Sequence, residues 1–138
     1  MSTLISKILS SLSKSELNNL GVTKITDYGK DKYRVKRIVV RYEDVPVSFC
    51  DIFSSEGYLD LTVATEKNSR EQGFAQTAVE RALIWINMNP ELSCDKKIRW
   101  VVLSDNYPSI ELAIRNGFII DKKVKDESGR IWSHFVLY

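Results

Sequence analysis

Residues 58–86 contain a strand pattern, a short polar segment with one glycine, and a helix pattern, in that order. Over 58–65 apolar residues recur at every second position, which is typical of a strand with one face in a core. Over 75–86 they recur at spacings of three and four, which predicts an amphipathic helix. Gly73 lies between the two patterns, where the chain must turn. The chain is therefore confined to folds in which a strand passes into a helix through a glycine turn.

A glycine turn that opens a helix is able to hold a phosphate group. The first amides of a helix have no acceptor within the helix, and the helix dipole adds partial positive charge at the same end. The P-loop motif is excluded because no Lys followed by Ser or Thr comes after the glycine, and the dinucleotide fingerprint is excluded because it needs three glycines. What remains is Arg-x-x-Gly-x-Ala over 70–75, which predicts an anion site made mainly of backbone amides.

The segment 70–75 resembles the acetyl-CoA-binding motif of the GNAT superfamily of N-acetyltransferases, Gln/Arg-x-x-Gly-x-Gly/Ala. A second segment, 106–118, looks like the superfamily's Asn-x-x-(Ser/Ala)-Ile-x-Leu-…-Gly-Phe sequence and follows a predicted strand. Pro108 near the start of this second helix and Gly117 at its end agree with ordinary helix-end preferences. The resemblance covers residues 57–118, and its specificity comes from the two motifs in this order.

The resemblance implies acetyl-CoA as a co-substrate and gives cofactor-binding roles to residues of this chain. In the superfamily, the strand before the turn pairs with the pantetheine arm, the turn amides hold the pyrophosphate, and an asparagine contacts the cofactor. The matching positions here are Val63, Ala64, Thr65, Arg70, Glu71, Gln72, Gly73, Phe74, Ala75 and Asn106. Asn106 is equally suited to cap a helix. Glu71 is expected to contribute only its backbone, because its carboxylate would repel a pyrophosphate.

The reaction that the resemblance implies is attack of an unprotonated amine on the acetyl thioester, with a base for the amine and an acid for the thiolate. The chain departs from the superfamily here: Ala113 replaces the tyrosine that is the acid in many members, and Val101 occupies a base position of some members. The remaining catalytic candidates are Tyr107, Ser109 and Asp60. Each also has a structural explanation, since Tyr107 can pack, Ser109 can cap a helix and Asp60 can be the exposed member of an alternating strand.

Few other residues are suited to chemistry. His134, the only histidine, is a candidate base because its unperturbed pKa lies near neutrality, but it alternates with apolar residues in a strand pattern, which favours a structural role. Cys50 and Cys94 lack metal-ligand spacing, so no metal site is expected. Trp85, Trp100 and Trp132 lie inside predicted elements and are expected in the core.

The chain as a whole predicts a single GNAT-like domain over residues 1–138, of the α+β class. An N-terminal helical pair is expected from an apolar stripe over 4–12 and a capping box over 13–16. Strands are predicted at 33–42, 45–53, 58–65, 99–104, 119–124 and 131–138, and further helices at 75–86 and 108–116. The superfamily fold is a mixed, mostly antiparallel central sheet flanked by helices.

Composition narrows the function classes. The net charge is +2, with Lys and Arg spread among Asp and Glu, which argues against nucleic acid as a partner. No apolar run has the length of a membrane helix and no cleavable signal pattern is present, so we expect no membrane partner and a cytoplasmic location. A monomer and a homodimer are both compatible with the sequence.

The leading hypothesis is an acetyl-CoA-dependent N-acetyltransferase acting on a primary amine of a small molecule or a protein. The alternative is a catalytically silent acyl-CoA-binding or protein-interaction module of the same fold, motivated by Ala113 and Val101. A nucleotide-binding regulatory domain is less favoured, because no base- or ribose-recognising motif accompanies the glycine turn. The sequence does not identify the acceptor amine.

Overall fold

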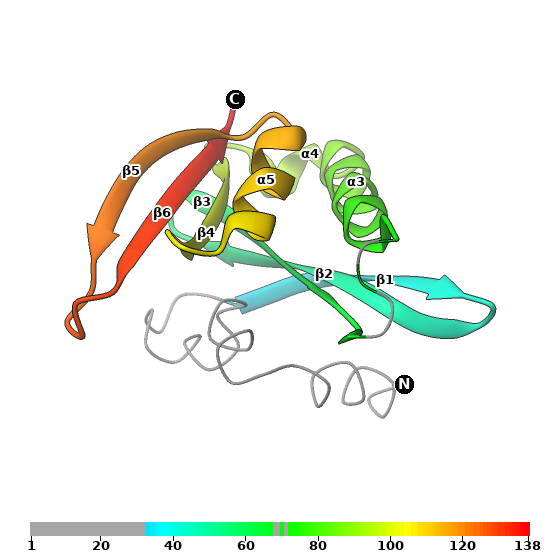
Figure 1. Cartoon of the computed structure of the whole chain (residues 1–138). Helices are drawn as coiled ribbons and strands as arrows, with labels where there is room; N and C mark the ends of the chain where they lie inside the picture. The colour runs from blue at the N-terminus through cyan, green and yellow to red at the C-terminus, as the bar shows by residue number, and fades with distance from the viewer. Residues whose placement is uncertain (1–32, 68–69, 71) are drawn as a thin grey trace.

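The computed structural model describes residues 33–67, 70 and 72–138, which form a six-stranded sheet with helices on one face (Figure 1). The elements are β1 (Tyr33–Tyr42), β2 (Val45–Ser55), β3 (Tyr58–Thr65), α3 (Phe74–Asn87), α4 (Pro90–Ser93), β4 (Lys97–Leu103), α5 (Tyr107–Arg115), β5 (Ile119–Lys125) and β6 (Ile131–Leu137). The α+β class and the predicted strands and longer helices are confirmed. The predicted N-terminal helical pair and Glu71 lie outside the described residues.

The short helix α4 is not predicted by the sequence patterns. Pro90 occupies its first turn, where the missing amide hydrogen costs nothing. The sequence pattern identifies this proline only as the end of the preceding helix, because a single turn is too short to show a helical period. No helix in the described ranges is long and apolar enough to cross a membrane.

The sheet is mixed, with strand order β1-β2-β3-β4-β6-β5. Every neighbouring pair is antiparallel except β3 and β4, which are parallel because α3 and α4 carry the chain back between them. This parallel pair lies at the centre of the sheet and has only three pairs of facing residues: Tyr58↔Lys97, Leu59↔Ile98 and Asp60↔Arg99.

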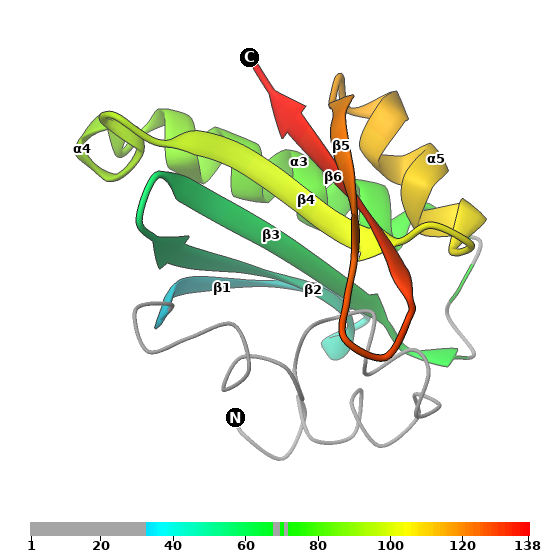
Figure 2. The same ribbon diagram turned by 90° about the vertical axis from the view of Figure 1, so that its left-hand side faces the viewer.

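Beyond Asp60 and Arg99 the sheet separates into two halves. The rest of β3 stays paired with β2 as far as Thr65, and the rest of β4 stays paired with β6 as far as Leu103, but the two strands no longer pair with each other. Figure 2 shows β3 and β4 starting side by side and ending apart. We call the region between β3 residues 61–65 and β4 residues 100–103 the split.

One face of the sheet packs against the helices. Leu59 and Leu61 of β3 and Trp100 and Val102 of β4 are buried in one core cluster with apolar residues of α3, Ala78, Val79 and Ala82. The prediction of core positions is confirmed for Trp100 and Trp132, which are both buried, while Trp85 is partly buried against the core.

The opposite face is also buried over β2 and the start of β3. Phe49, Asp51 and Phe53 are buried there, and Asp60 is only 2% exposed. The expectation that Asp60 is the exposed member of an alternating strand is therefore wrong. Alternation identifies the residues that face the helices, but it does not report whether the second face is open to solvent.

Candidate functional site

Gly73 forms the start of α3 in the left-handed backbone conformation, with φ 82° and ψ 4°. Its carbonyl accepts hydrogen bonds from the Thr77 amide (3.1 Å) and from Thr77 Oγ1 (3.2 Å). Among the described residues no side-chain hydrogen bond caps this end of the helix, and a Cβ atom added to Gly73 would meet nothing within 4 Å. The amides of Phe74, Ala75 and Gln76 are the first of the helix and have no acceptor within it, so they are suited to hold an anion.

The end of β3 presents backbone groups to the split. Ser48 Oγ donates to the Ala64 carbonyl (2.8 Å) from β2, so Ala64 directs its backbone toward β2. Backbone groups of successive strand residues point to opposite edges, so Val63 and Thr65 direct theirs toward the split. The parallel ladder has already ended at this level, so in the described ranges no strand pairs with these groups.

Arg70 connects the turn to the end of β3. Its Nε donates to the Thr65 carbonyl at 3.3 Å, which places the guanidinium group beside the mouth of the split. Gln72 and Gly73 are exposed on the same turn. The structure thus brings the predicted turn residues and the end of β3 together, at the N-terminus of α3.

The start of α5 follows the far end of β4. Asn106 is the N-cap of this helix, and its Oδ1 accepts from the Ser109 amide at 3.4 Å. Ser109 Oγ accepts from Trp100 Nε1 at 3.0 Å, so this hydroxyl satisfies a buried indole instead of capping the helix. Tyr107 does not pack into the core, since it is 70% exposed. Its hydroxyl remains accessible to a ligand.

Asp60 and Arg99 form a buried ion pair at the apex of the split, where the last facing residues of β3 and β4 meet. Arg99 Nε lies 2.6 Å from one Asp60 oxygen and Nη2 lies 2.9 Å from the other. The guanidinium carbon also lies 3.8 Å from the centroid of the Tyr58 ring. Both carboxylate oxygens of Asp60 are therefore engaged in hydrogen bonds with Arg99. No local sequence pattern indicates this partner, because the two residues are 39 positions apart.

His134 on β6 faces Val101 on β4 in the antiparallel register. Its Nδ1 is buried and makes no hydrogen bond within the described ranges. Burial lowers the pKa of His134, and the positive charges of Arg99 and Lys122 lower it further. The imidazole is therefore neutral at pH 7. Ala113, which the sequence resemblance aligns with the superfamily's tyrosine, is completely buried and has no group to transfer a proton.

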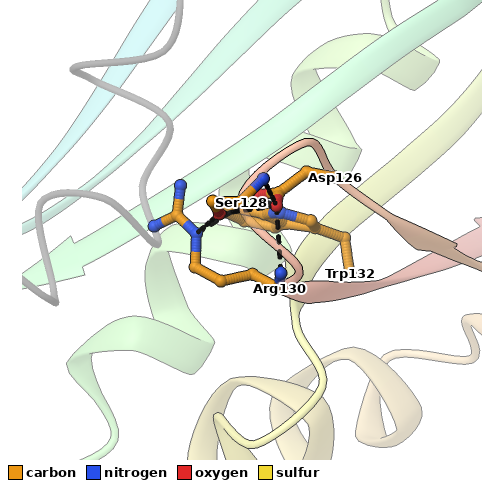
Figure 3. Close-up of polar contacts among 4 residues, drawn as sticks. All are labelled: Asp126, Ser128, Arg130 and Trp132. Atoms are coloured by element: carbon orange, nitrogen blue, oxygen red, sulfur yellow. Dashed lines mark hydrogen bonds and ion pairs between the residues drawn. The ribbon is translucent and has the colours of Figure 1, made fainter.

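Asp126 organises the hairpin between β5 and β6 (Figure 3). Its Oδ1 accepts from the Ser128 amide (2.9 Å), the Ser128 hydroxyl (2.6 Å) and the Arg130 amide (3.0 Å). Its Oδ2 accepts from Trp132 Nε1 (2.9 Å) and Arg130 Nε (3.2 Å). The Ser128 hydroxyl and then the Trp132 indole hold the pKa of Asp126 well below its usual range. The sequence predicts a hairpin turn over 126–129, since Asp-x-Ser-Gly is a turn signature, but it does not predict the hydrogen bonds to Arg130 and Trp132.

The described residues contain no group of His, Cys, Asp or Glu side chains that could hold a metal ion. Cys50 is buried, and burial strongly raises the pKa of its thiol, which keeps the thiol protonated and unreactive. Cys94 is exposed, and both cysteines are free thiols. The candidate site therefore combines three features. The first is a candidate anion cradle, by which we mean the first backbone amides of α3 after Gly73. The others are the split between β3 and β4 and a small set of side chains able to carry protons.

No protein-family model matches the sequence, and no curated protein matches it. The structure, however, is similar to solved acetyltransferases. A mutant spermidine N-acetyltransferase from Vibrio cholerae is 19% identical over 91% of this chain and 75% of that chain, with a TM-score of 0.63. A ribosomal-protein-alanine N-acetyltransferase from Brucella melitensis is 17% identical over 71% and 65%, with a TM-score of 0.60. A Salmonella typhimurium protein described as an acetyltransferase, with its cofactor acetyl-CoA, is 15% identical over 72% and 61%, with a TM-score of 0.60.

The fold is that of the GNAT N-acetyltransferases, as the two sequence motifs predicted. The likeness at these identities establishes the fold. The chain spans less than two thirds of the length of the Salmonella and Brucella proteins.

Proposed function

We propose that this chain is an acetyl-CoA-dependent N-acetyltransferase that transfers an acetyl group to a primary amine of a small molecule or a protein. The observation that carries the proposal is the position of the N-terminus of α3, which begins at Gly73, at the mouth of the split, where Arg70 bonds to Thr65. The cradle fits a pyrophosphate and the split fits an extended amide-containing arm, and acetyl-CoA has both groups in this order. A similarly folded protein, from Salmonella typhimurium, is described with acetyl-CoA as its cofactor.

In this proposal the pyrophosphate lies against the backbone amides over 70–75, with Gly73 allowing close approach. The pantetheine arm lies along the end of β3 as an additional strand. Val63 and Thr65 supply its hydrogen-bond partners, because their backbone groups face the split, and Ala64 lies between them. The side-chain oxygen of Asn106 caps α5, so Asn106 contacts the arm from the other half of the sheet through its remaining polar atoms.

The chemistry needs the amine and the thioester to be held in line, which by itself supplies a large part of the rate enhancement. Of the catalytic candidates, Tyr107 is accessible and carries a hydroxyl able to protonate the thiolate. Ser109 is engaged by Trp100, and Asp60 is engaged by Arg99. We therefore assign Asp60 an electrostatic role at the apex of the split, beside the acyl group.

The acceptor class is supported by the similar structures, one of which is described as acting on spermidine and another on a ribosomal protein alanine. Both acceptors present a primary amine. A cytoplasmic location, a monomeric or homodimeric state and the absence of nucleic-acid and membrane partners remain predictions.

A silent acyl-CoA-binding module is the second candidate. It is favoured by Ala113, which is completely buried, and by Val101, since neither residue is able to carry a proton. The two candidates share the cofactor site and differ in turnover alone.

Calorimetry with acetyl-CoA tests the cofactor site, and two glycines provide a matched pair of variants. Gly73 and Gly57 both have φ 82° and open space where a Cβ atom would lie, but Gly57 lies at the other end of β3. We expect Gly73→Glu to abolish binding, because a carboxylate then occupies the cradle, and Gly57→Glu to leave the affinity unchanged. Equal affinities in the two variants, or no binding by the wild type, would refute the proposal.

Turnover separates the two candidates. Free thiol released from acetyl-CoA is measured with spermidine, amino sugars and peptide N-termini as acceptors. Release that depends on the acceptor supports the enzyme, and binding without release across the panel supports the silent module.

A further inference from the structure

We propose that His134 is the proton acceptor of acyl transfer, supplying from β6 the base that Val101 does not provide on β4. This inference rests on the proposed function and adds a named residue to it. The sequence alone favoured a structural role for His134, because it lies in an alternating strand. The register of the strands changes that interpretation.

Val101 and His134 are direct partners in the antiparallel pair of β4 and β6, so their side chains lie on the same face, with Cβ atoms about 5 Å apart. Arg99 is two residues from Val101 and shares this face, and Asp60 faces Arg99 across the last rung of the parallel ladder. His134 therefore lies on the same face as the Asp60–Arg99 pair, one strand from the split.

An acyl group carried into the split would arrive close to Val101. The pyrophosphate cradle lies at the C-terminal end of β3, so an arm that enters the split there extends toward its apex. The Ser104 amide donates to the Ile131 carbonyl of β6 at 2.9 Å, so the backbone hydrogen-bonding groups of Ser104 point toward β6. Those of every second residue before it on β4 point the same way. Val101 therefore directs its backbone into the split. The thioester would thus approach the level of Val101, within reach of its neighbour's imidazole.

The imidazole of His134 is in the state that a base requires. A buried polar atom normally has a hydrogen-bond partner, and one without a partner calls for an explanation. Nδ1 of His134 is such an atom in the part of the chain that the structure describes. Four charged groups act on the ring from three strands: Arg99 and Lys122 disfavour its protonation, whereas Asp60 and Asp121 favour it. A neutral imidazole has a lone pair on one ring nitrogen, and because the buried Nδ1 is closed to a substrate, the nitrogen that accepts the proton in this proposal is Nε2.

Atoms and charges balance in the proposed step. The neutral amine nitrogen attacks the thioester carbon, a C–N bond forms, and the carbonyl electron pair moves to oxygen. The nitrogen, now positively charged, gives its proton to the imidazole of His134. The C–S bond then breaks, the thiolate takes a proton from the Tyr107 hydroxyl, the Tyr107 oxygen regains a proton from solvent, and the imidazolium gives its proton to solvent. The products are the acetylated amine and coenzyme A.

The single histidine allows a direct test by NMR, because all imidazole signals in this chain come from His134. In the free protein we expect its pKa below 6.5, and we expect its ring signals to shift when acetyl-CoA is added. Binding seen by calorimetry with no change in these signals would overturn the role of His134 while leaving the cofactor site intact. Absence of binding would instead overturn the proposed function itself.

Kinetics with acetyl-CoA and the best acceptor of the panel completes the test. We expect His134→Gln to lower kcat by about 10²- to 10⁴-fold, to keep the Kd for acetyl-CoA and the melting temperature, and to lose the acid limb of the pH–rate profile. Imidazole added to His134→Ala should restore part of the rate. Unchanged kcat and pH profile in His134→Gln, or a wild type that binds acetyl-CoA without turnover, would refute the inference.

Discussion

Gln76 and Asn116 exchange a reciprocal pair of side-chain hydrogen bonds between the first turn of α3 and the end of α5. Gln76 Nε2 donates to Asn116 Oδ1 at 2.8 Å, and Asn116 Nδ2 donates to Gln76 Oε1 at 2.9 Å. Asn116 Nδ2 also donates to the Leu112 carbonyl (2.8 Å), which fixes the amide on α5. The pair therefore holds the turn that begins at Gly73 in place relative to the helix that follows the other half of the sheet.

Asn116→Leu should weaken both stability and cofactor binding. Two hydrogen bonds between α3 and α5 are lost, so we expect the free energy of unfolding to fall by about 1–2 kcal/mol. We also expect the Kd for acetyl-CoA to rise about fivefold, as for a loss of about 1 kcal/mol. Urea denaturation and calorimetry measure the two effects.

The control for this prediction is Asn89→Leu at the other end of α3. Asn89 Nδ2 donates to the Trp85 carbonyl at 2.7 Å, so this variant also loses a hydrogen bond of an asparagine side chain. It should lower stability without changing the Kd. The double variant Gln76→Asn and Asn116→Gln exchanges the two side chains and should recover at least half of the affinity for acetyl-CoA that Asn116→Leu loses. Failure to recover it would contradict a specific role of the pair.

The elements of the fold could be predicted from the sequence because their periods are long enough to recognise. The prediction of Gly73 as a turn residue was also confirmed, since its φ of 82° is one that side chains with a Cβ rarely adopt. The four-residue helix α4 could not be predicted, because one turn has no period. The extent of the split could not be predicted either, since strand patterns do not show where two parallel strands stop pairing.

Ser109→Ala should destabilise the protein more than a surface substitution would. Trp100 is 2% exposed, and its indole nitrogen loses its acceptor when Ser109 Oγ is removed. A buried donor left without a partner costs about 1–3 kcal/mol in the free energy of unfolding. Thermal and urea denaturation measure this loss.

The same variant decides whether Ser109 also takes part in the reaction. If its hydroxyl is structural, kcat of the folded fraction stays within about twofold, an effect of about 0.4 kcal/mol. Ser109→Thr keeps a hydroxyl and should restore most of the stability. A fall in kcat at unchanged stability would instead return Ser109 to the catalytic candidates.

Arg99→Ala should be among the most destabilising single substitutions in the described part of the chain. It leaves the Asp60 carboxylate buried with its principal charge partner removed, and such a change typically costs about 3–5 kcal/mol. Adding Asp60→Asn should recover part of this loss, because the buried charge is then removed as well. If Arg99→Ala alone cost less than about 1 kcal/mol, the ion pair would not be an important part of the fold.

The candidate site could be predicted only in part, for reasons that these residues illustrate. The glycine turn at Gly73 could be predicted because its backbone conformation and the following helix leave local signals. The Asp60–Arg99 pair and the juxtaposition of Val101 with His134 depend on strand register between distant segments, which no local pattern encodes. Ala113 and Val101 are the positions at which the resemblance implies that the superfamily's usual proton carriers are missing, and this implication stays a prediction.

The pH dependence of stability should reveal His134 independently of catalysis. Its pKa in the folded protein is lowered from 6.5, so the unfolded chain binds the proton more readily. The free energy of unfolding should therefore fall as the pH decreases from 6.5 through the folded pKa, and this group should contribute no pH dependence above 6.5. His134→Gln should remove this component and leave a flatter profile between pH 7 and pH 5, measured by urea denaturation. In Arg99→Lys, which keeps the positive charge, the NMR titration of His134 should still lie below 6.5. Parallel stability profiles of the wild type and His134→Gln would show that the ring titrates equally in the folded and unfolded chains.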